Sequence, residues 1–173
     1  LKEKGIEVLG GDISIRLTYR FATESELDFI KVNSSFYTET TDFRSMAVLE
    51  KKGKIVDSAL IQVKGVDDKY PLYGEVELTP DIALPEALLK TNGVYGVVVA
   101  EQLLDRLDLR INEKIKIGNN FFEIRAKLRK EPDLGSSTFS FAPKVIAYNK
   151  GLLESGLLGP GTMFDTDYRL KSP

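Results

Sequence analysis

The sequence has 173 residues, of which 42% are hydrophobic and 29% are charged, and its net charge is −2. This is the composition of a folded globular chain with a real core, and it argues against a broad basic face for nucleic acid. The chain contains no cysteine and no histidine, which excludes disulfides, thiolate metal sites and every Ser–His or Cys–His nucleophile pair.

No apolar run approaches the roughly 20 residues that span a bilayer, and no signal peptide is visible. The first residue is Leu1 rather than Met. We therefore expect an excised or processed piece of a longer protein, with flanking segments, including membrane helices, absent from this chain.

The first third of the chain predicts the order strand, helix, strand, strand. Apolar and polar residues alternate from residue 13 to residue 19, the pattern of a half-buried strand. Thr23 and Glu26 have capping-box spacing, which predicts a helix over about residues 24–34. Two strands follow around a tight turn at residues 51–53. The apolar positions assigned to these two strands are Met46, Val48, Ala59, Ile61 and Val63.

The middle of the chain breaks this pattern and then restores it. Prolines and glycines make residues 67–93 mostly irregular, with at most two helical turns at residues 85–89, where Pro85 suits a first helical position. A cassette over residues 97–118 then reads as an apolar strand, a short helix and an alternating strand. Asn112 can take the left-handed turn before the second strand. The helix stripe of the cassette is Ala100, Leu103, Leu104 and Leu107.

The last third predicts a hairpin, a buried strand, a helix and a final strand. The hairpin places Phe122, Ile124, Ala126 and Leu128 on one oily face and charged residues on the other. Residues 145–148 read as a second covered strand, and Asn149 can cap the next helix. The final strand turns Phe164 and Tyr168 inward.

The acidic and glycine-rich motifs indicate no cofactor site. Asp67-Asp68 and Asp165-x-Asp167 are the tight acidic pairs of the sequence, and the latter pair would share one face of a strand and could meet a hard cation. A calcium site needs about six or more oxygen ligands, so we interpret both as a turn and a solvated strand face. The glycines at 93, 96, 159 and 161 fit neither a P-loop nor a dinucleotide fingerprint. We expect no cofactor and no metal.

The basic residues of the hairpin leave three readings open. Lysines and arginines between residues 114 and 130 are interleaved with Phe121 and Phe122, as on a stacking platform for single-stranded nucleic acid. Phe122 alternates into the apolar row, which favours the solvated face of a two-faced sheet. The same face could also meet lipid headgroups. We expect no nucleic-acid partner.

No serine has a nucleophile motif around it. A hydrolase would have to use carboxylates alone, and we predict that the chain is not an enzyme.

Several stretches together resemble a known family. The cassette GVVVAEQLLDRLDLRINEKIKIG, residues 96–118, resembles the signature of the extracytoplasmic domain of MacB/FtsX-type ABC transporter permeases. The further stretches GGDI, FRSM, VDDKYPLYG, EPD and YRL, which begin at residues 10, 43, 66, 131 and 168, are similar to the YbbP-like branch and arrive in the expected order. Two positions depart from the pattern: Asn112 replaces a turn glycine, and Ala100 replaces a small polar capping residue.

This resemblance implies an α+β fold, a two-lobed MacB-like periplasmic core. It implies a discontinuous lobe of strand–helix–strand units, residues 1–64 with 138–173, and an inserted mixed α/β lobe, residues 65–137. It also implies a location at the cell inner membrane, with the domain on the periplasmic side between the first two membrane helices.

The resemblance further implies a function in transport. The partner would be an ABC ATPase subunit, reached through the missing membrane part of the permease. ATP hydrolysis would drive extraction or hand-over of a lipophilic or peptide-like cargo, or force on a periplasmic partner protein. The alternative is a periplasmic adaptor or solute-binding module with no link to an ATPase.

Two expectations concern geometry. Both chain ends should leave the same side of the domain, with residues 1–5 beside residues 170–173 as adjacent strands. The contact surface for cargo or partner should then lie on the inserted lobe and its Pro-rich segment, residues 70–85. Tyr70, Leu72 and Tyr73 are the expected exposed contacts, because aromatic side chains give large contact area. The alternative is that these side chains fold back as a lid on the core.

Overall fold

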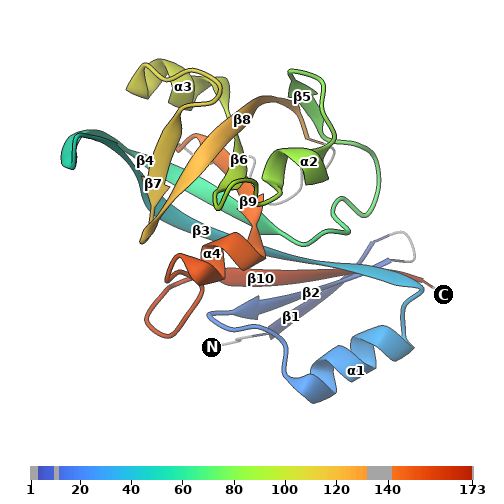
Figure 1. Ribbon diagram of the computed structural model, residues 1–173. Coiled ribbons are helices and arrows are strands. Elements are labelled where there is room, and N and C mark those ends of the chain that lie inside the picture. The colour runs from blue at the N-terminus through green and yellow to red at the C-terminus, as the bar shows by residue number, and fades with distance from the viewer. Residues whose placement is uncertain (1–3, 10–11, 132–141, 173) are drawn as a thin grey trace.

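Six strands form a closed, mixed barrel in the computed structural model, which describes residues 4–9, 12–131 and 142–172 (Figure 1). The ring is closed because β7 pairs with both β8 and β3. Of the strand pairs in the ring, β4–β9 and β6–β8 are parallel, and the others are antiparallel. In ring order the strands are β3 (Phe36–Lys51), β4 (Lys54–Val66), β9 (Lys144–Tyr148), β6 (Tyr95–Val99), β8 (Asn120–Lys130) and β7 (Lys114–Ile117).

An open sheet extends from the first half of β3. Its order is β1–β2–β10–β3, and all its pairs are antiparallel. The added strands are β1 (Lys4–Leu9), β2 (Asp12–Thr18) and β10 (Asp165–Lys171). Helix α1 (Glu24–Val32) covers one face of this sheet (Figure 1), where its buried Ile30 joins a small apolar cluster with β2 and β10.

Short elements surround the barrel. Strand β5 (Glu77–Thr79) pairs with β8, and the helices are α2 (Leu84–Leu88), α3 (Glu101–Leu107) and α4 (Asn149–Glu154). Helix α2 lies so close to β6 that a Cβ on Gly96 would stand 1.8 Å from the carbonyl oxygen of Ala87. In the described ranges, no helix has both the length and the apolar character needed to cross a bilayer.

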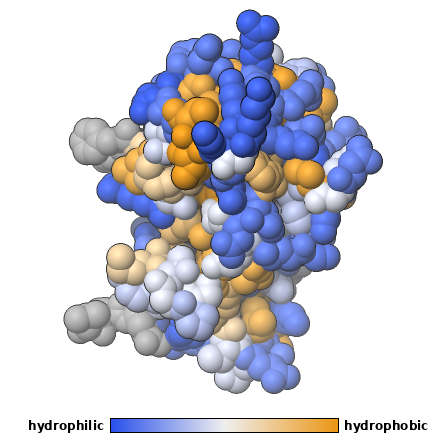
Figure 2. Space-filling model, turned by 60° about the vertical axis from the view of Figure 1, so that its left-hand side comes forward, coloured by the Kyte–Doolittle hydropathy of each residue, from blue (hydrophilic) through white to orange (hydrophobic). Residues whose placement is uncertain are grey.

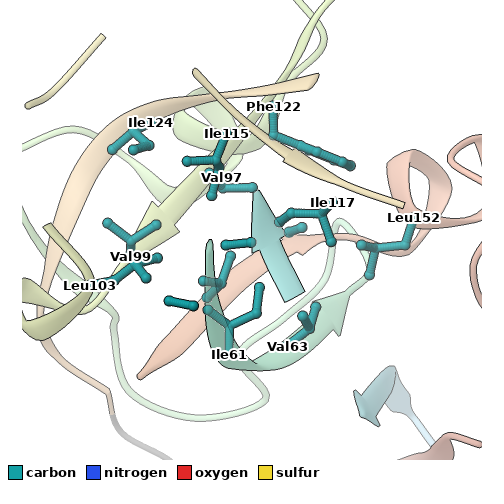
Figure 3. Packing of buried hydrophobic residues seen from close by; sticks show 14 of the residues in the cluster. Ile61, Val63, Val97, Val99, Leu103, Ile115, Ile117, Phe122, Ile124 and Leu152 are labelled. Carbon is teal, nitrogen blue, oxygen red and sulfur yellow. The ribbon is translucent and has the colours of Figure 1, made fainter. Parts of the chain in front are cut away.

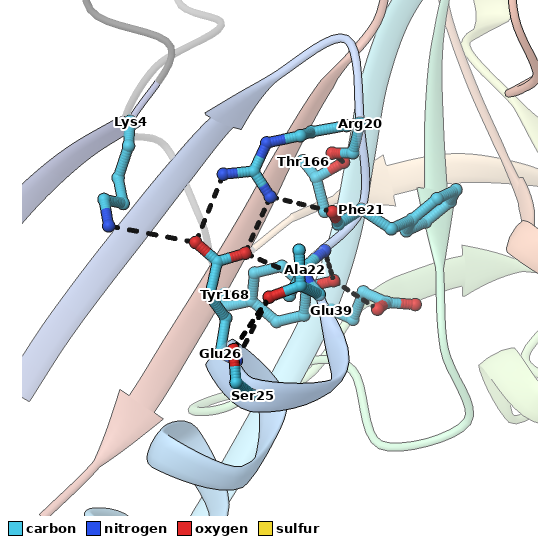
Figure 4. Close-up of polar contacts among 10 residues, drawn as sticks. Lys4, Arg20, Phe21, Ala22, Ser25, Glu26, Glu39, Thr166 and Tyr168 are labelled. Carbon is cyan, nitrogen blue, oxygen red and sulfur yellow. Dashed lines mark hydrogen bonds and ion pairs between the residues drawn. The ribbon is translucent and has the colours of Figure 1, made fainter.

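The start of α1 forms as its sequence predicts. Thr23 and Glu26 make both hydrogen bonds of a capping box. The guanidinium of Arg20 also donates to both carboxylate oxygens of Glu26, at 2.7 and 3.1 Å, and Lys4 lies 3.8 Å away (Figure 4). The hydrogen bond from Arg20, followed by that from the backbone of Thr23, lowers the pKa of Glu26 to about 2.

The cassette also forms as predicted and fills the barrel. All five residues of β6 are buried, and α3 buries Leu103 and Leu107. Ala100 is the N-cap of α3 without a side-chain hydrogen bond, and Asn112 has a φ of 81°. Figure 3 shows the barrel interior, which is lined by Ile61, Val63, Val97, Val99, Leu103, Ile115, Ile117, Phe122, Ile124 and Leu152.

The prediction that the hairpin has a single apolar face is wrong. Phe122 and Ile124 lie in the barrel core, whereas Ala126 and Leu128 belong to a second apolar cluster under α2. The register against β6 shifts after Ile124, so Arg125 is an extra residue on β8. Such a β-bulge turns the following side chains to the other face.

Two smaller predictions are also wrong. In the second half of β3 the buried residues are Ala47 and Leu49, whereas Met46 is 44% exposed. Asn149 does not cap α4, because the N-cap is Tyr148. The amide of Asn149 instead bonds to β3: it accepts from Thr41 Oγ1 at 2.7 Å and donates to the carbonyl of Glu39 at 3.2 Å.

The prediction that the chain ends form adjacent strands is wrong, because β2 lies between β1 and β10. Lys4 pairs with Leu17, whereas Leu170 pairs with Ile13, so the described ends lie at opposite ends of β2. Both still belong to the open sheet. The remaining residues of this prediction, 1–3 and 173, lie outside the described residues.

The division into two lobes stays a prediction. Strands β6, β7 and β8 of the expected insertion close one barrel with β3, β4 and β9. At the expected joint of residues 65–69, Gly65 and Val66 are buried in β4 and Asp68 is exposed. The second joint, residues 135–140, lies outside the described residues.

Candidate functional site

A strap over residues 70–74 leaves the end of β4 and crosses the polar face of the open sheet. Asp67 sets its start, since one carboxylate oxygen accepts from the backbone N–H groups of Lys69 and Tyr70, each at 3.0 Å. The other oxygen accepts from the N–H of Glu39 on β3 at 2.8 Å. This turn fixes where the strap leaves β4.

The strap and the sheet enclose a pocket of about 290 Å³. Its walls combine apolar strap residues with hydroxyl and charged side chains of β3 and β10. The lining residues are Thr38, Thr40, Tyr70, Pro71, Leu72, Tyr73, Gly74, Asp167 and Arg169. The three side chains chosen from the sequence therefore line one pocket, in which apolar and hydrogen-bonding groups can meet a ligand together.

Tyr70 is the anchor of the strap, and the prediction that it is exposed is wrong. It is 6% exposed, its hydroxyl lies 3.2 Å from Glu131 Oε2, and Lys64 Nζ lies 4.7 Å from its ring centroid. Glu131 itself pairs with Lys144 at 2.5 Å and with Lys64 at 3.6 Å. Tyr70 thus folds back as part of a lid, which was the alternative reading.

Tyr73 is the exposed member of the three, and Leu72 is half-buried. Tyr73 is 42% exposed, and its hydroxyl donates to Asp12 Oδ2 on β2 at 2.6 Å. This hydrogen bond raises the pKa of the Tyr73 phenol. Two cations lie near the ring, with the Arg169 guanidinium 5.9 Å and Lys171 Nζ 5.4 Å from its centroid. Tyr73 therefore ties the strap to the sheet while leaving part of its ring accessible.

The strands under the strap carry charges of both signs. Asp167 accepts a hydrogen bond from Ser14 at 2.7 Å and lies 3.7 Å from Arg16. Two residue pairs along the ladder, Asp42 faces Asp165, and burial raises the pKa of Asp42 to about 6. In the sequence, polar residues at every second position, Thr38 with Thr40 and Asp167 with Arg169, indicate these polar faces. Nothing in that pattern indicates that a strap covers them.

Three of the six basic residues of the hairpin, Lys116, Arg125 and Lys127, form ion pairs within the fold. Lys127 contacts Glu101 at 3.0 Å, and Arg125 contacts Glu123 at 2.8 Å. Arg125 also donates to the carbonyl oxygens of Leu89 and, at 2.8 Å, Val94. These contacts favour the solvated-face reading over a stacking platform. In the ranges that the structure describes, no group of three or more acidic residues could hold a metal ion.

Comparisons with known proteins give one sequence relative. No protein-family model matches the chain. The chain is 29% identical over 110 residues to YbbP of Escherichia coli (strain K12), described as an uncharacterized ABC transporter permease. The match covers 64% of this chain and 13% of that permease, so the chain spans only a small part of its relative.

Solved structures match the fold more completely. The extracellular domain of YknZ, a noncanonic ABC-type transporter from Gram-positive bacteria, superposes with a TM-score of 0.57 at 11% identity, covering 87% of this chain and 73% of that one. The periplasmic region of MacB from Actinobacillus actinomycetemcomitans gives 0.54 at 11% identity, covering 92% and 74%. This chain has the fold of MacB-type permease domains.

The resemblance stated from the sequence is therefore confirmed. The fold is a mixed α/β fold, mostly of strands around the six-stranded barrel, like the periplasmic region of MacB. The sequence relative is an ABC transporter permease, and the two solved structures that share the fold are the extracellular domain and the periplasmic region of such transporters.

Proposed function

We propose that this domain is the moving extracytoplasmic part of a permease that couples cytoplasmic ATP hydrolysis to the extraction or hand-over of a lipophilic or peptide-like cargo, or to force on a periplasmic partner protein. The observation that carries the proposal is the sequence match to the YbbP permease. The folds of the YknZ and MacB domains support it. The ATPase subunit would bind elsewhere, on the membrane part of the permease.

The strap pocket is the contact that we propose for cargo or partner. Tyr73 and Leu72 offer the accessible surface, and Tyr70 holds the strap in place. A mixed pocket of this size accepts part of an amphiphilic molecule or a few side chains of a peptide. The strap lies over β3 and β10, and each of these strands is paired with a neighbour on both sides. A loop held by a fixed scaffold is the usual arrangement for a binding site.

The test uses the full-length permease, purified with its ATPase in lipid nanodiscs. Tyr73→Arg should leave complex assembly and basal ATP hydrolysis unchanged, while a growth or efflux phenotype that depends on the permease is lost. Leu153→Arg, at a 50% exposed leucine on α4 away from the pocket, is the matched control. A full-length protein that has no membrane helices and binds no ATPase would favour the alternative, an adaptor or solute-binding module.

We also propose that the domain works without nucleotide or metal of its own. The chain has no P-loop, no cysteine and no histidine. Calorimetric titration of the purified domain with ATP–Mg, zinc or calcium should show no specific one-to-one binding. Micromolar one-to-one binding of any of them would refute this part of the proposal.

The inserted lobe, residues 65–137, remains part of the proposal as the body that presents the strap. Limited proteolysis tests it, because chain joints are cut before packed elements. First cleavage beside the exposed Asp68 fits the lobe division, whereas first cleavage inside the buried strand β6 contradicts it.

A further inference from the structure

The turn between β3 and β4 projects from the barrel. The barrel closes at the pair Val48–Lys116, and residues 51–56 continue beyond it as a hairpin tip, seen in teal in Figure 1. Lys52 and Gly53 form the two-residue turn, with φ values of 54° and 75°. Two successive positive φ values are typical of the tight hairpin turns whose twist matches that of the strands. We call residues 51–56 the hairpin tip.

The charge of the hairpin tip is not balanced by its neighbours. The acidic residues on either side are already paired: Glu50 lies 3.1 Å from Lys116, and Asp57 lies 3.0 Å from Arg106. The three lysines of the tip are exposed, and none has an ion pair with any described residue. These lysines are Lys51, Lys52 and Lys54. The tip therefore presents three positive charges to the solvent.

Two aliphatic side chains stand beside these lysines. Ile55 is 68% exposed and Val56 is 54% exposed. The β3–β4 register runs from Leu49–Asp57 to Glu50–Ile55, so Val56 has no partner residue and forms a bulge. Figure 2, which brings this side of the molecule forward, shows hydrophobic surface among hydrophilic residues in its upper half.

We propose that the hairpin tip docks on an anionic lipid surface, with the lysines at the headgroups and Ile55 and Val56 in the interfacial layer. Lysines around exposed aliphatic residues are the composition of interfacial membrane contacts. Protein interfaces instead favour aromatic residues and arginine and are depleted in lysine. The tip contains no aromatic residue and no arginine, which argues against an acidic protein as the partner.

The test is co-sedimentation of the purified chain with vesicles of phosphatidylcholine alone and of phosphatidylcholine mixed with phosphatidylglycerol. We expect binding to the mixed vesicles only, weakened by added salt. Exchanging Lys51, Lys52 and Lys54 for Gln should weaken binding by about fivefold for each lysine removed. Ile55→Ser with Val56→Ser keeps the charge and should also weaken binding.

Matched controls lie elsewhere on the surface. Lys31→Gln and Met163→Ser change an exposed lysine and a 72% exposed apolar residue outside the tip, and both should bind like the parent. Circular dichroism establishes that each variant is folded. Three results would overturn the proposal: no binding to the mixed vesicles at low salt, equal binding to both vesicle types, or an Ile55/Val56 variant that binds like the parent.

Discussion

The barrel and the open sheet share strand β3, yet they are held together by different interactions. The barrel closes on itself and fills its interior with aliphatic and aromatic side chains contributed by strands, α3 and α4 (Figure 3). Among the described residues, β1 is the outermost strand of the open sheet and pairs with β2 alone, and the apolar cluster of this sheet is small. Its buried Tyr168 also carries a hydroxyl that needs partners (Figure 4).

This difference gives the two regions separate roles, the barrel as the scaffold and the open sheet as the region that carries the strap pocket. Apolar packing involves no group that gains or loses a proton, so the packing of the barrel should not change with pH. The open sheet relies on hydrogen bonds, ion pairs and buried carboxyl groups, whose strength depends on protonation and on exact geometry. The strap pocket lies on the polar face of this second region.

The largest effect should come from the barrel. Leu103 is fully buried, and Leu103→Ala should lower the free energy of unfolding by about 2–4 kcal/mol, because the cavity cannot collapse in a closed barrel. Urea denaturation measures this loss. Leu153→Ala, the same change at a 50% exposed position, should cost little. An unchanged midpoint for Leu103→Ala would show that α3 does not pack on the barrel as described.

The next largest effect should come from the polar centre of the open sheet. Tyr168 donates to Glu39 Oε2 at 2.6 Å and accepts from the backbone N–H of Ala22 at 3.0 Å. Tyr168→Phe removes both bonds and should cost about 1–3 kcal/mol, because it leaves Ala22 and a half-buried carboxylate without this partner. Tyr37→Phe in the same sheet is the control. Equal stability of the two variants would contradict the role given to Tyr168.

A pH measurement should sharpen the contrast. Burial raises the pKa of Asp42 to about 6 from an ordinary value of 3.8, so the folded state binds the proton more tightly than the unfolded state does. Stability should therefore fall as the pH rises between these two values. Asp42→Asn should be more stable than the parent by up to about 3 kcal/mol above this window and equal to it below. Parallel pH profiles of parent and variant would contradict this.

The smallest effect on stability should come from the strap. The Tyr73 hydroxyl is exposed and bonds to Asp12 at the surface, so Tyr73→Phe should change the free energy of unfolding by less than about 0.5 kcal/mol. Thermal unfolding measures this. By contrast, Tyr70→Phe, which alters the buried anchor, should cost more. A reversed order would mean that the strap is held by its exposed residue.

Local patterns in the sequence predicted the elements that depend on neighbours in the chain. The capping box at Thr23 and Glu26, the stripe of Leu103 and Leu107, and the left-handed Asn112 all form as expected. Each depends on spacing or on a conformational preference that a few residues determine.

The order of the strands did not follow from such patterns. Strand β10 inserts between β2 and β3, and β9 inserts between β4 and β6, although each pair of neighbours is far apart in the sequence. The insertion of β2 between the terminal strands is why the chain ends were misplaced. The bulge at Arg125 likewise depends on the pairing of β8 with β6, which alternation along one strand does not reveal.

Only part of the pocket was predicted, because its lining also depends on contacts between segments that are distant in the sequence. Tyr70, Leu72 and Tyr73 were chosen because aromatic and apolar residues in a Pro-rich segment suggest contacts. Tyr70 is buried and Tyr73 is exposed because of partners that are distant in the sequence: Tyr70 contacts Glu131, and Tyr73 contacts Asp12. Thr38 and Arg169, which complete the pocket, gave no signal beyond strand alternation.

The central claim is that ATP hydrolysis in the cytoplasm drives a movement of this domain, which would lie on the outer side of the membrane. Cysteine labelling tests it directly, because this chain has no cysteine of its own. In a full-length permease with its other cysteines replaced, Tyr73→Cys should react with a membrane-impermeant maleimide from outside the cell membrane. Its labelling rate should differ between the nucleotide-free and ATP-trapped complexes, while Leu153→Cys labels at one rate. Equal rates for Tyr73→Cys in both states, or labelling from the cytoplasmic side, would contradict the account.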